Sequence, residues 1–102
     1  TDILAYIDQN YTDPNLCAGV IADVFHISEK YVFQLQKSCC NETLNDRILR
    51  LRIDEGIRLL TTTDLTITTI AKKTGFSSSN TMYKAFMRVK GISPSSYRGK
   101  EI

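Results

Sequence analysis

The sequence predicts an all-α fold, and two observations lead to that prediction. No run of residues alternates apolar and polar side chains convincingly, as a half-buried strand would. Apolar residues instead recur at helical spacing along the chain, and the helical pattern itself occurs twice. With 102 residues, of which 42% are hydrophobic, the chain is expected to form one domain or two small halves that share one framework.

The two copies of the pattern are related by a nearly constant register. They match at an offset of 49 residues, which becomes 50 after the turn, where Val32 corresponds to Met82. Each copy is therefore expected to contain a helix, a short turn and a second helix, with one extra residue in the second turn. Leu16, Ile21, Ala22 and Ser28 correspond in this way to Leu65, Ile70, Ala71 and Ser77.

A short opening helix precedes the first copy. It carries an apolar stripe over residues 3–11, and the Asp-Pro-Asn sequence at 13–15 breaks it. In the copy itself, small Ala22 suits a close helix crossing, and Ser28 can cap the second helix. His26 stands at the turn and would adopt the turn conformation at some strain. The residues expected to face the core are Ile27, Tyr31, Val32 and Leu35.

Residues 42–60 are predicted to form one long helix between the copies. Its apolar side chains lie on two sides, so the helix is expected to pack against both copies. Gly56 in its middle costs about 1 kcal/mol of helix propensity. Its carboxylates, on Asp46, Asp54 and Glu55, are interleaved with arginines as exposed i,i+4 pairs are.

Helix signals are clearer in the second copy. Thr66 can cap its first helix, and Gly75 supplies the positive φ that ends it. Residues 77–79 are serines that offer caps for the next helix, which Gly91 stops. A last short helix is expected to begin at Pro94, where a missing N–H costs nothing. The residues expected in the core are Phe76, Met82, Phe86 and Val89.

Charge is distributed unevenly along the chain. The net charge of +2 is weak evidence for any partner, but residues 1–15 carry −3 and residues 78–102 carry +4. Such asymmetry is typical of a chain that meets a polyanion at one end, although a solvated basic surface would look the same.

Several classes of protein are disfavoured by the composition. The odd number of cysteines and the single histidine argue against a disulfide framework and a zinc site, so neither metal nor cofactor is expected. No catalytic set can be assembled, so no enzyme activity is expected. No apolar run approaches the ~20 residues that cross a membrane. Cys17, Cys39 and Cys40 are expected to be reduced thiols in a cytoplasm, with a redox switch as the alternative, and the chain from Thr1 is expected to be an excised fragment.

A family resemblance emerges from the second half of the chain. Gly75-Phe76, Phe86 and the run Gly91-Ile92-Ser93-Pro94-Ser95-Ser96-Tyr97-Arg98 closely resemble the C-terminal signature of the AraC/XylS family of transcription regulators. Arg52-Ile53-Asp54-Glu55 is similar to the linker helix of that family, and the resemblance covers about residues 3–100.

The resemblance implies a seven-helix, homeodomain-like fold. It divides the chain into two helix-turn-helix subdomains, residues 1–41 and 61–102, joined by the linker helix at 42–60. It further implies that the chain is the sequence-specific DNA-binding domain of a bacterial regulator, with two recognition helices in successive major grooves of double-stranded promoter DNA. Any dimerisation would belong to a domain outside this chain, and no membrane contact is expected.

The same register selects candidate DNA-binding residues. Gln and Asn can pair with adenine, Lys can donate to guanine, and Phe can contact a thymine methyl group. Serine hydroxyls and helix N-termini can donate to phosphates. The first recognition helix would present Lys30, Phe33 and Gln34 to base edges, with Lys37 near phosphate. The second would present Ser79, Asn80, Tyr83 and Lys84 to base edges, with Ser77 and Arg88 toward the backbone.

The first copy departs from the family pattern. Many members have an aromatic residue where Gln36 stands and glycine where His26 stands. The first recognition helix is also nearly uncharged, because Lys30 and Lys37 are offset by Asp23 and Glu29. The second copy is therefore expected to supply most of the electrostatic attraction. The alternative is an interaction module of the same fold, with weak or partial DNA binding and RNA polymerase as its candidate partner.

Overall fold

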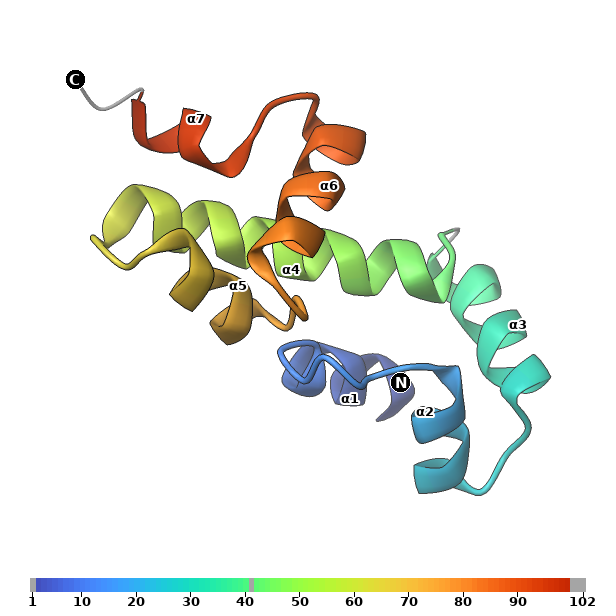
Figure 1. Ribbon diagram of the computed structural model, residues 1–102. Helices are drawn as coiled ribbons and strands as arrows, with labels where there is room; N and C mark the ends of the chain where they lie inside the picture. Colours follow the sequence, from blue (N-terminus) through green and yellow to red (C-terminus); the bar gives the residue numbers. More distant parts are fainter. Residues whose placement is uncertain (1, 41, 100–102) are drawn as a thin grey trace.

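The structure is a computed structural model that describes residues 2–40 and 42–99 (Figure 1). Within these ranges every regular element is an α-helix, so the predicted all-α class is confirmed. The side chains of Cys39 and Cys40, the boundary at residue 41 and Lys100 lie outside the described part. The helices are α1 (Asp2–Asn10), α2 (Ala18–Phe25), α3 (Glu29–Cys40), α4 (Leu44–Thr62), α5 (Ile67–Thr74), α6 (Ser79–Lys90) and α7 (Pro94–Gly99).

The predicted repeat is present in the helices. Helices α2 and α5 have 8 residues each and begin 49 positions apart. Helices α3 and α6 have 12 residues each and begin 50 positions apart. The starts of α4 and α7 are also 50 positions apart. The turn between α5 and α6 therefore holds the one extra residue that the sequence indicated.

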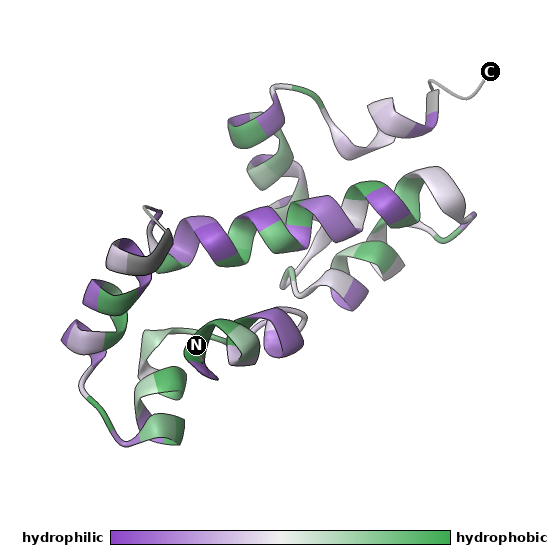
Figure 2. Cartoon of the chain, turned by 180° about the vertical axis from the view of Figure 1, so that it is seen from behind, coloured by the Kyte–Doolittle hydropathy of each residue, from purple (hydrophilic) through white to green (hydrophobic). Residues whose placement is uncertain are grey.

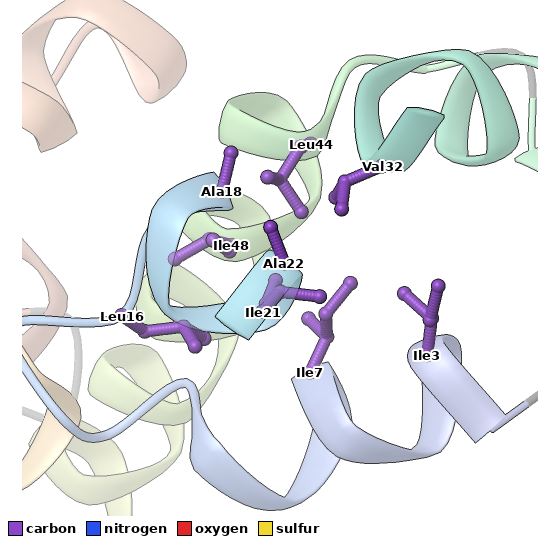
Figure 3. Packing of buried hydrophobic residues seen from close by; sticks show 9 residues of the cluster. All are labelled: Ile3, Ile7, Leu16, Ala18, Ile21, Ala22, Val32, Leu44 and Ile48. Carbon is purple, nitrogen blue, oxygen red and sulfur yellow. The ribbon is translucent and has the colours of Figure 1, made fainter. Parts of the chain in front are cut away.

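Helix α4 joins two separate hydrophobic cores. Its first half contributes Leu44 and Ile48 to a core that α1, α2 and α3 complete (Figure 3). Its second half contributes Ile53, Leu59 and Leu60 to a core shared with α5 and α6. Green and purple residues alternate along α4 in Figure 2, as a helix covered on two sides requires. The helix begins two residues later than predicted, because Thr43 caps it by accepting from the Asp46 N–H at 3.1 Å. It also ends two residues later, at Thr62.

The helix ends use the residues that the sequence indicated. Ser28, Thr66 and Ser78 each accept a backbone N–H three residues ahead, at 3.1 Å. Gly75 and Gly91 end α5 and α6 with φ of 98° and 77°. His26 ends α2 in the left-handed conformation with φ of 57°, so the predicted strain is present.

Two residues predicted to face the core are exposed. Tyr31 is 48% exposed because Val32 and Gln36 occupy the inner face of α3, and Tyr31 precedes that face by one position. Val89 is also 48% exposed, because the last turn of α6 borders an open groove beside α4 with Leu49 and Ile53. Ile27 is partly buried against the first core.

The arginines of α4 bond differently from the predicted i,i+4 pairs. Arg58 pairs with Glu55 three positions earlier at 2.6 Å, and Arg50 pairs with Glu42 outside the helix at 3.0 Å. The Glu55 carboxylate accepts from Arg58, which lowers the pKa of Glu55. Arg47 reaches across to Asp8 of α1 at 2.8 Å.

Arg52 connects the two halves of the molecule. Its Nε donates to the Tyr11 carbonyl at 2.8 Å, and Nη2 donates to the Asp13 carbonyl at 2.9 Å. Gly75 packs against the same loop: a Cβ there would overlap the Tyr11 carbonyl oxygen and lie 2.7 Å from Arg52 Nε. The turn before α6 therefore lies in close contact with the loop after α1.

We expect His26→Gly to raise the free energy of unfolding by roughly 0.5–1 kcal/mol, since relief of the left-handed strain exceeds the added freedom of the unfolded chain. Urea denaturation measures the change. His26→Ala removes the imidazole but keeps the strain and should not stabilise. A loss of stability in the glycine variant would show that the imidazole itself holds the turn.

Gln36→Met is also expected to stabilise the chain. Gln36 is 1% exposed, and neither polar atom of its amide has a hydrogen-bond partner in the described part of the chain. Methionine has a similar length and removes both unpaired atoms, so unfolding should cost about 1–3 kcal/mol more. Gln34→Met on the exposed face of α3 should change stability by less than about 0.5 kcal/mol. Equal effects of the two substitutions would contradict this account.

Gly75→Ala and Gly91→Ala form a matched pair. Both positions have positive φ, but a Cβ at Gly91 has nothing within 4 Å. Gly91→Ala should therefore cost about 1–2 kcal/mol from backbone strain alone, and Gly75→Ala should cost at least about 3 kcal/mol because of the added overlap with backbone. Chemical denaturation of both variants tests the difference. Similar losses would mean that the loop moves away easily.

Candidate nucleic-acid interface

Helices α3 and α6 both lie against α4. Helix α3 is at the N-terminal end of α4, and α6 crosses its middle (Figure 1). On their inner sides, Val32 and Gln36 of α3 occupy the positions of Met82 and Phe86 of α6, and all four are buried. Of the side chains between these positions, Leu35 and Ala85 still pack against the cores, and the other two on each helix are exposed.

The outer face of α3 carries all four residues that the sequence selected there. Lys30, Phe33, Gln34 and Lys37 follow the i, i+3, i+4, i+7 spacing of one helix face, and each is exposed. Phe33 is 46% exposed although its side chain is apolar. The four residues thus form one exposed face that combines two lysines, an amide and an aromatic ring.

Helix α6 repeats this arrangement 50 residues later. Asn80, Tyr83 and Lys84 are exposed on one face, and Tyr83 is 48% exposed. The fourth position of the pattern is Met87, which is 40% exposed. The sequence selection omitted Met87, although the repeat register pairs it with Lys37 and could have identified it.

Three other selected residues lie to the sides of this face. Ser77 precedes α6, is exposed, and its hydroxyl is 3.1 Å from that of Thr81. Ser79 is half-buried at the start of α6. Arg88 is exposed but borders hollows beside α4, with Asn45, Leu49 and Arg52. The structure therefore groups Asn80, Tyr83 and Lys84 on one face and places Arg88 on the flank toward the first half.

The charges near the interface are mostly basic on α6. Lys84, Arg88 and Lys90 are exposed there, whereas α3 combines Lys30 and Lys37 with Glu29. Arg98 is not available to this surface, because its guanidinium donates to the carbonyls of Leu60 and Thr63 at 3.1 and 2.9 Å.

The described ranges hold neither a metal-ligand cluster nor a membrane-spanning helix. Nowhere in them do three or more His, Cys, Asp or Glu side chains gather as the ligands of a metal ion would. None of the helices in these ranges combines the length and apolar character needed to span a membrane.

Comparisons with known proteins agree with this arrangement. Residues 21–100 match the model of a helix-turn-helix domain family. The chain is 31% identical over 98 residues to the raffinose operon transcriptional regulatory protein RafR of Pediococcus pentosaceus, covering 93% of this chain and 34% of RafR. It is 31% identical over 97 residues to the regulatory protein SoxS of Escherichia coli, covering 95% of this chain and 90% of SoxS. The chain thus spans about a third of the length of RafR and nearly all of SoxS.

Solved structures share the fold. The C-terminal domain of the two-component response regulator yesN from Fusobacterium nucleatum has a TM-score of 0.90 and 28% identity, and the match covers 94% of this chain and 93% of that one. The DNA-binding domain of AdpA, solved with a target DNA, has a TM-score of 0.88 and 21% identity, with 97% and 88% covered. By its family match and its likeness to SoxS over most of both chains, this chain belongs to the AraC/XylS family of helix-turn-helix transcription regulators.

Proposed function

We propose that the chain is the sequence-specific DNA-binding domain of a bacterial transcription regulator. The observation that carries this proposal is the pair of matching outer faces on α3 and α6, held by one rigid helix. Residues 1–41 and 61–102 would act as two helix-turn-helix subdomains, with residues 42–60 as their linker. Each subdomain would place its second helix in a major groove of promoter DNA.

The positions of α3 and α6 along α4 bear on whether they can enter successive grooves. The 19 residues of α4 span about 28 Å at ~1.5 Å per residue. One turn of B-DNA is about 34 Å, the distance between successive major grooves on one side of the duplex. Because α3 lies at one end of α4 and α6 crosses its middle, only about half of the length of α4 separates them along its axis, so their spacing on DNA would depend on the directions of α3 and α6 as well as on α4.

The exposed side chains suit both readout and anchoring. Amides and lysines on the two faces can pair with adenine and guanine, and the apolar side chains can contact thymine methyl groups. The base contacts would come from Lys30, Phe33, Gln34, Ser79, Asn80, Tyr83 and Lys84, and the phosphate contacts from Lys37, Ser77 and Arg88.

The remaining properties of the whole regulator follow from this role. The domain would act in the cytoplasm without enzymatic activity, and dimerisation would belong to another part of the full protein. Contact with RNA polymerase is the second candidate function, favoured by the exposed carboxylate of Glu29 beside Lys30 on α3. That alternative would be supported if the chain did not bind DNA, or if its affinity for DNA did not change with salt concentration.

Asn80→Ala and Arg88→Ala should have different effects on DNA binding. Asn80→Ala should relax base preference at particular positions of one half-site and cost about 1–3 kcal/mol, as should Lys84→Ala. Arg88→Ala should weaken binding to all sequences and reduce the salt dependence by about one ion. Selection of sites from a random duplex pool, followed by mobility shifts at several salt concentrations, measures both effects.

Arg58→Ala supplies the control, because it removes an exposed cation from α4 outside the two outer faces. It should leave base preference unchanged. A uniform loss of affinity from Asn80→Ala, with the same base preference as the unsubstituted chain, would contradict its assignment as a base contact.

A further inference from the structure

A hollow of about 430 Å³ lies beside α6, on the side of α7. We call it the α6–α7 hollow. Ile67, the first residue of α5, and Pro94, the first residue of α7, line it. Its polar lining residues are Ser79, Asn80, Tyr83, Ser93 and Ser95.

The chemistry of this lining suits an anion attached to an apolar group. Three serines, a tyrosine and an amide can all donate hydrogen bonds, and none of the lining side chains is charged. Hydroxyl and amide groups of this kind commonly contact the phosphates of nucleic acids. Ile67 is partly exposed, and its apolar surface suits the deoxyribose that accompanies each phosphate, whereas Pro94 is buried.

The position of the hollow fits the path of a DNA strand. Asn80 and Tyr83 belong both to the hollow and to the outer face of α6. Ser79 and Arg88 are nine residues apart, about two and a half helical turns, so they project on opposite sides of α6. With α6 in a major groove, one bordering strand would pass Arg88 and the other would pass the hollow.

The first copy provides an internal comparison. By the repeat register, Ser79 corresponds to Glu29, and Ile67 at the start of α5 corresponds to Ala18 at the start of α2. The Glu29 carboxylate oxygen Oε2 lies 3.7 Å from the place of a Cβ on Gly19, the second residue of α2. The equivalent place in the first copy therefore already holds an anion of the chain itself, next to the positive end of a helix.

We infer that the α6–α7 hollow holds one backbone phosphate of bound DNA, on the strand across the groove from Arg88. The inference rests on the proposed function. It adds Ser93 and Ser95 to the interface and reassigns Ser79 from a base contact to this phosphate contact. Because the hollow carries no charge, this contact fixes the position of the duplex without displacing counterions. Losing it therefore weakens binding equally at all salt concentrations, unlike the loss of Arg88.

The test uses a duplex selected by the chain itself, prepared with a single neutral methylphosphonate at each backbone position in turn. At one backbone position, different from the one that Arg88 contacts, the methylphosphonate should weaken binding of the unsubstituted chain about tenfold. This is the value for one hydrogen bond to a charged group. The Ser79→Ala/Ser95→Ala double variant should lose sensitivity at that position alone. Ser93 is kept, because its hydroxyl lies within 3.2 Å of those of Ser95 and Ser96.

Ser79→Glu copies the first subdomain and sharpens the test. Its carboxylate should reverse the preference at the same position, so that the neutral methylphosphonate binds better than the phosphate. Ser38→Ala, which removes an exposed serine hydroxyl from α3 far from the hollow, should keep the original pattern. Each variant is folded if a methylphosphonate at the DNA position that Arg88 contacts still weakens its binding.

The outcomes separate the two proposals. The inference is supported if the double variant loses methylphosphonate sensitivity at that one position and Ser79→Glu reverses the preference between phosphate and methylphosphonate there. Normal binding with the full methylphosphonate pattern kept in the double variant overturns the inference and leaves the proposed function standing. Failure of the unsubstituted chain to select any duplex overturns the proposed function, and the inference with it.

Discussion

The two halves of this domain hold a fixed relation because Arg52 bonds to the loop after α1. Its two hydrogen bonds to the Tyr11 and Asp13 carbonyls bring that loop against Gly75, where a side chain has no room. The guanidinium is half-buried, and this burial lowers the pKa of Arg52, although arginine stays charged at any physiological pH. A linker helix alone would set the distance between α3 and α6. The Arg52 contact also sets their orientation, on which simultaneous entry into two grooves would depend.

Equivalent positions show that the two halves have diverged in stability. The left-handed turn residue is His26 in the first and Gly75 in the second. The inner residue of the second helix is Gln36 in the first, with an unpaired buried amide, and Phe86 in the second, packed edge-on against Tyr97. Each difference costs the first half free energy. Local opening is therefore expected to begin around α2 and α3.

The sequence predicted the helices well, because their evidence is local. The relevant signals act within a few residues: helical periodicity, the capping residues Ser28 and Thr66, and the terminating Gly75. The repeat register also allowed the helices of one copy to be checked against those of the other. Burial was wrong for Tyr31, which precedes the inner face of α3 by one position, and for Val89, where the last turn of α6 borders an open groove beside α4. The roles of Arg52 and Arg98 depend on carbonyls about 40 residues away in sequence, which periodicity does not reveal.

The same distinction separates the parts of the candidate interface. Exposed outer faces follow from helical spacing, so the sequence indicated them, although Met87 was not chosen as a DNA-binding candidate. The α6–α7 hollow is built by three helices and has no local signal. In the proposed complex, charged Arg88 and the neutral hollow would contact the phosphates of the two strands on either side of α6. The first half would lack the second of these contacts, because the Glu29 carboxylate occupies the equivalent place. The first half would then contribute to DNA binding mainly through side chains that read bases, and its contribution would vary with sequence more than with salt.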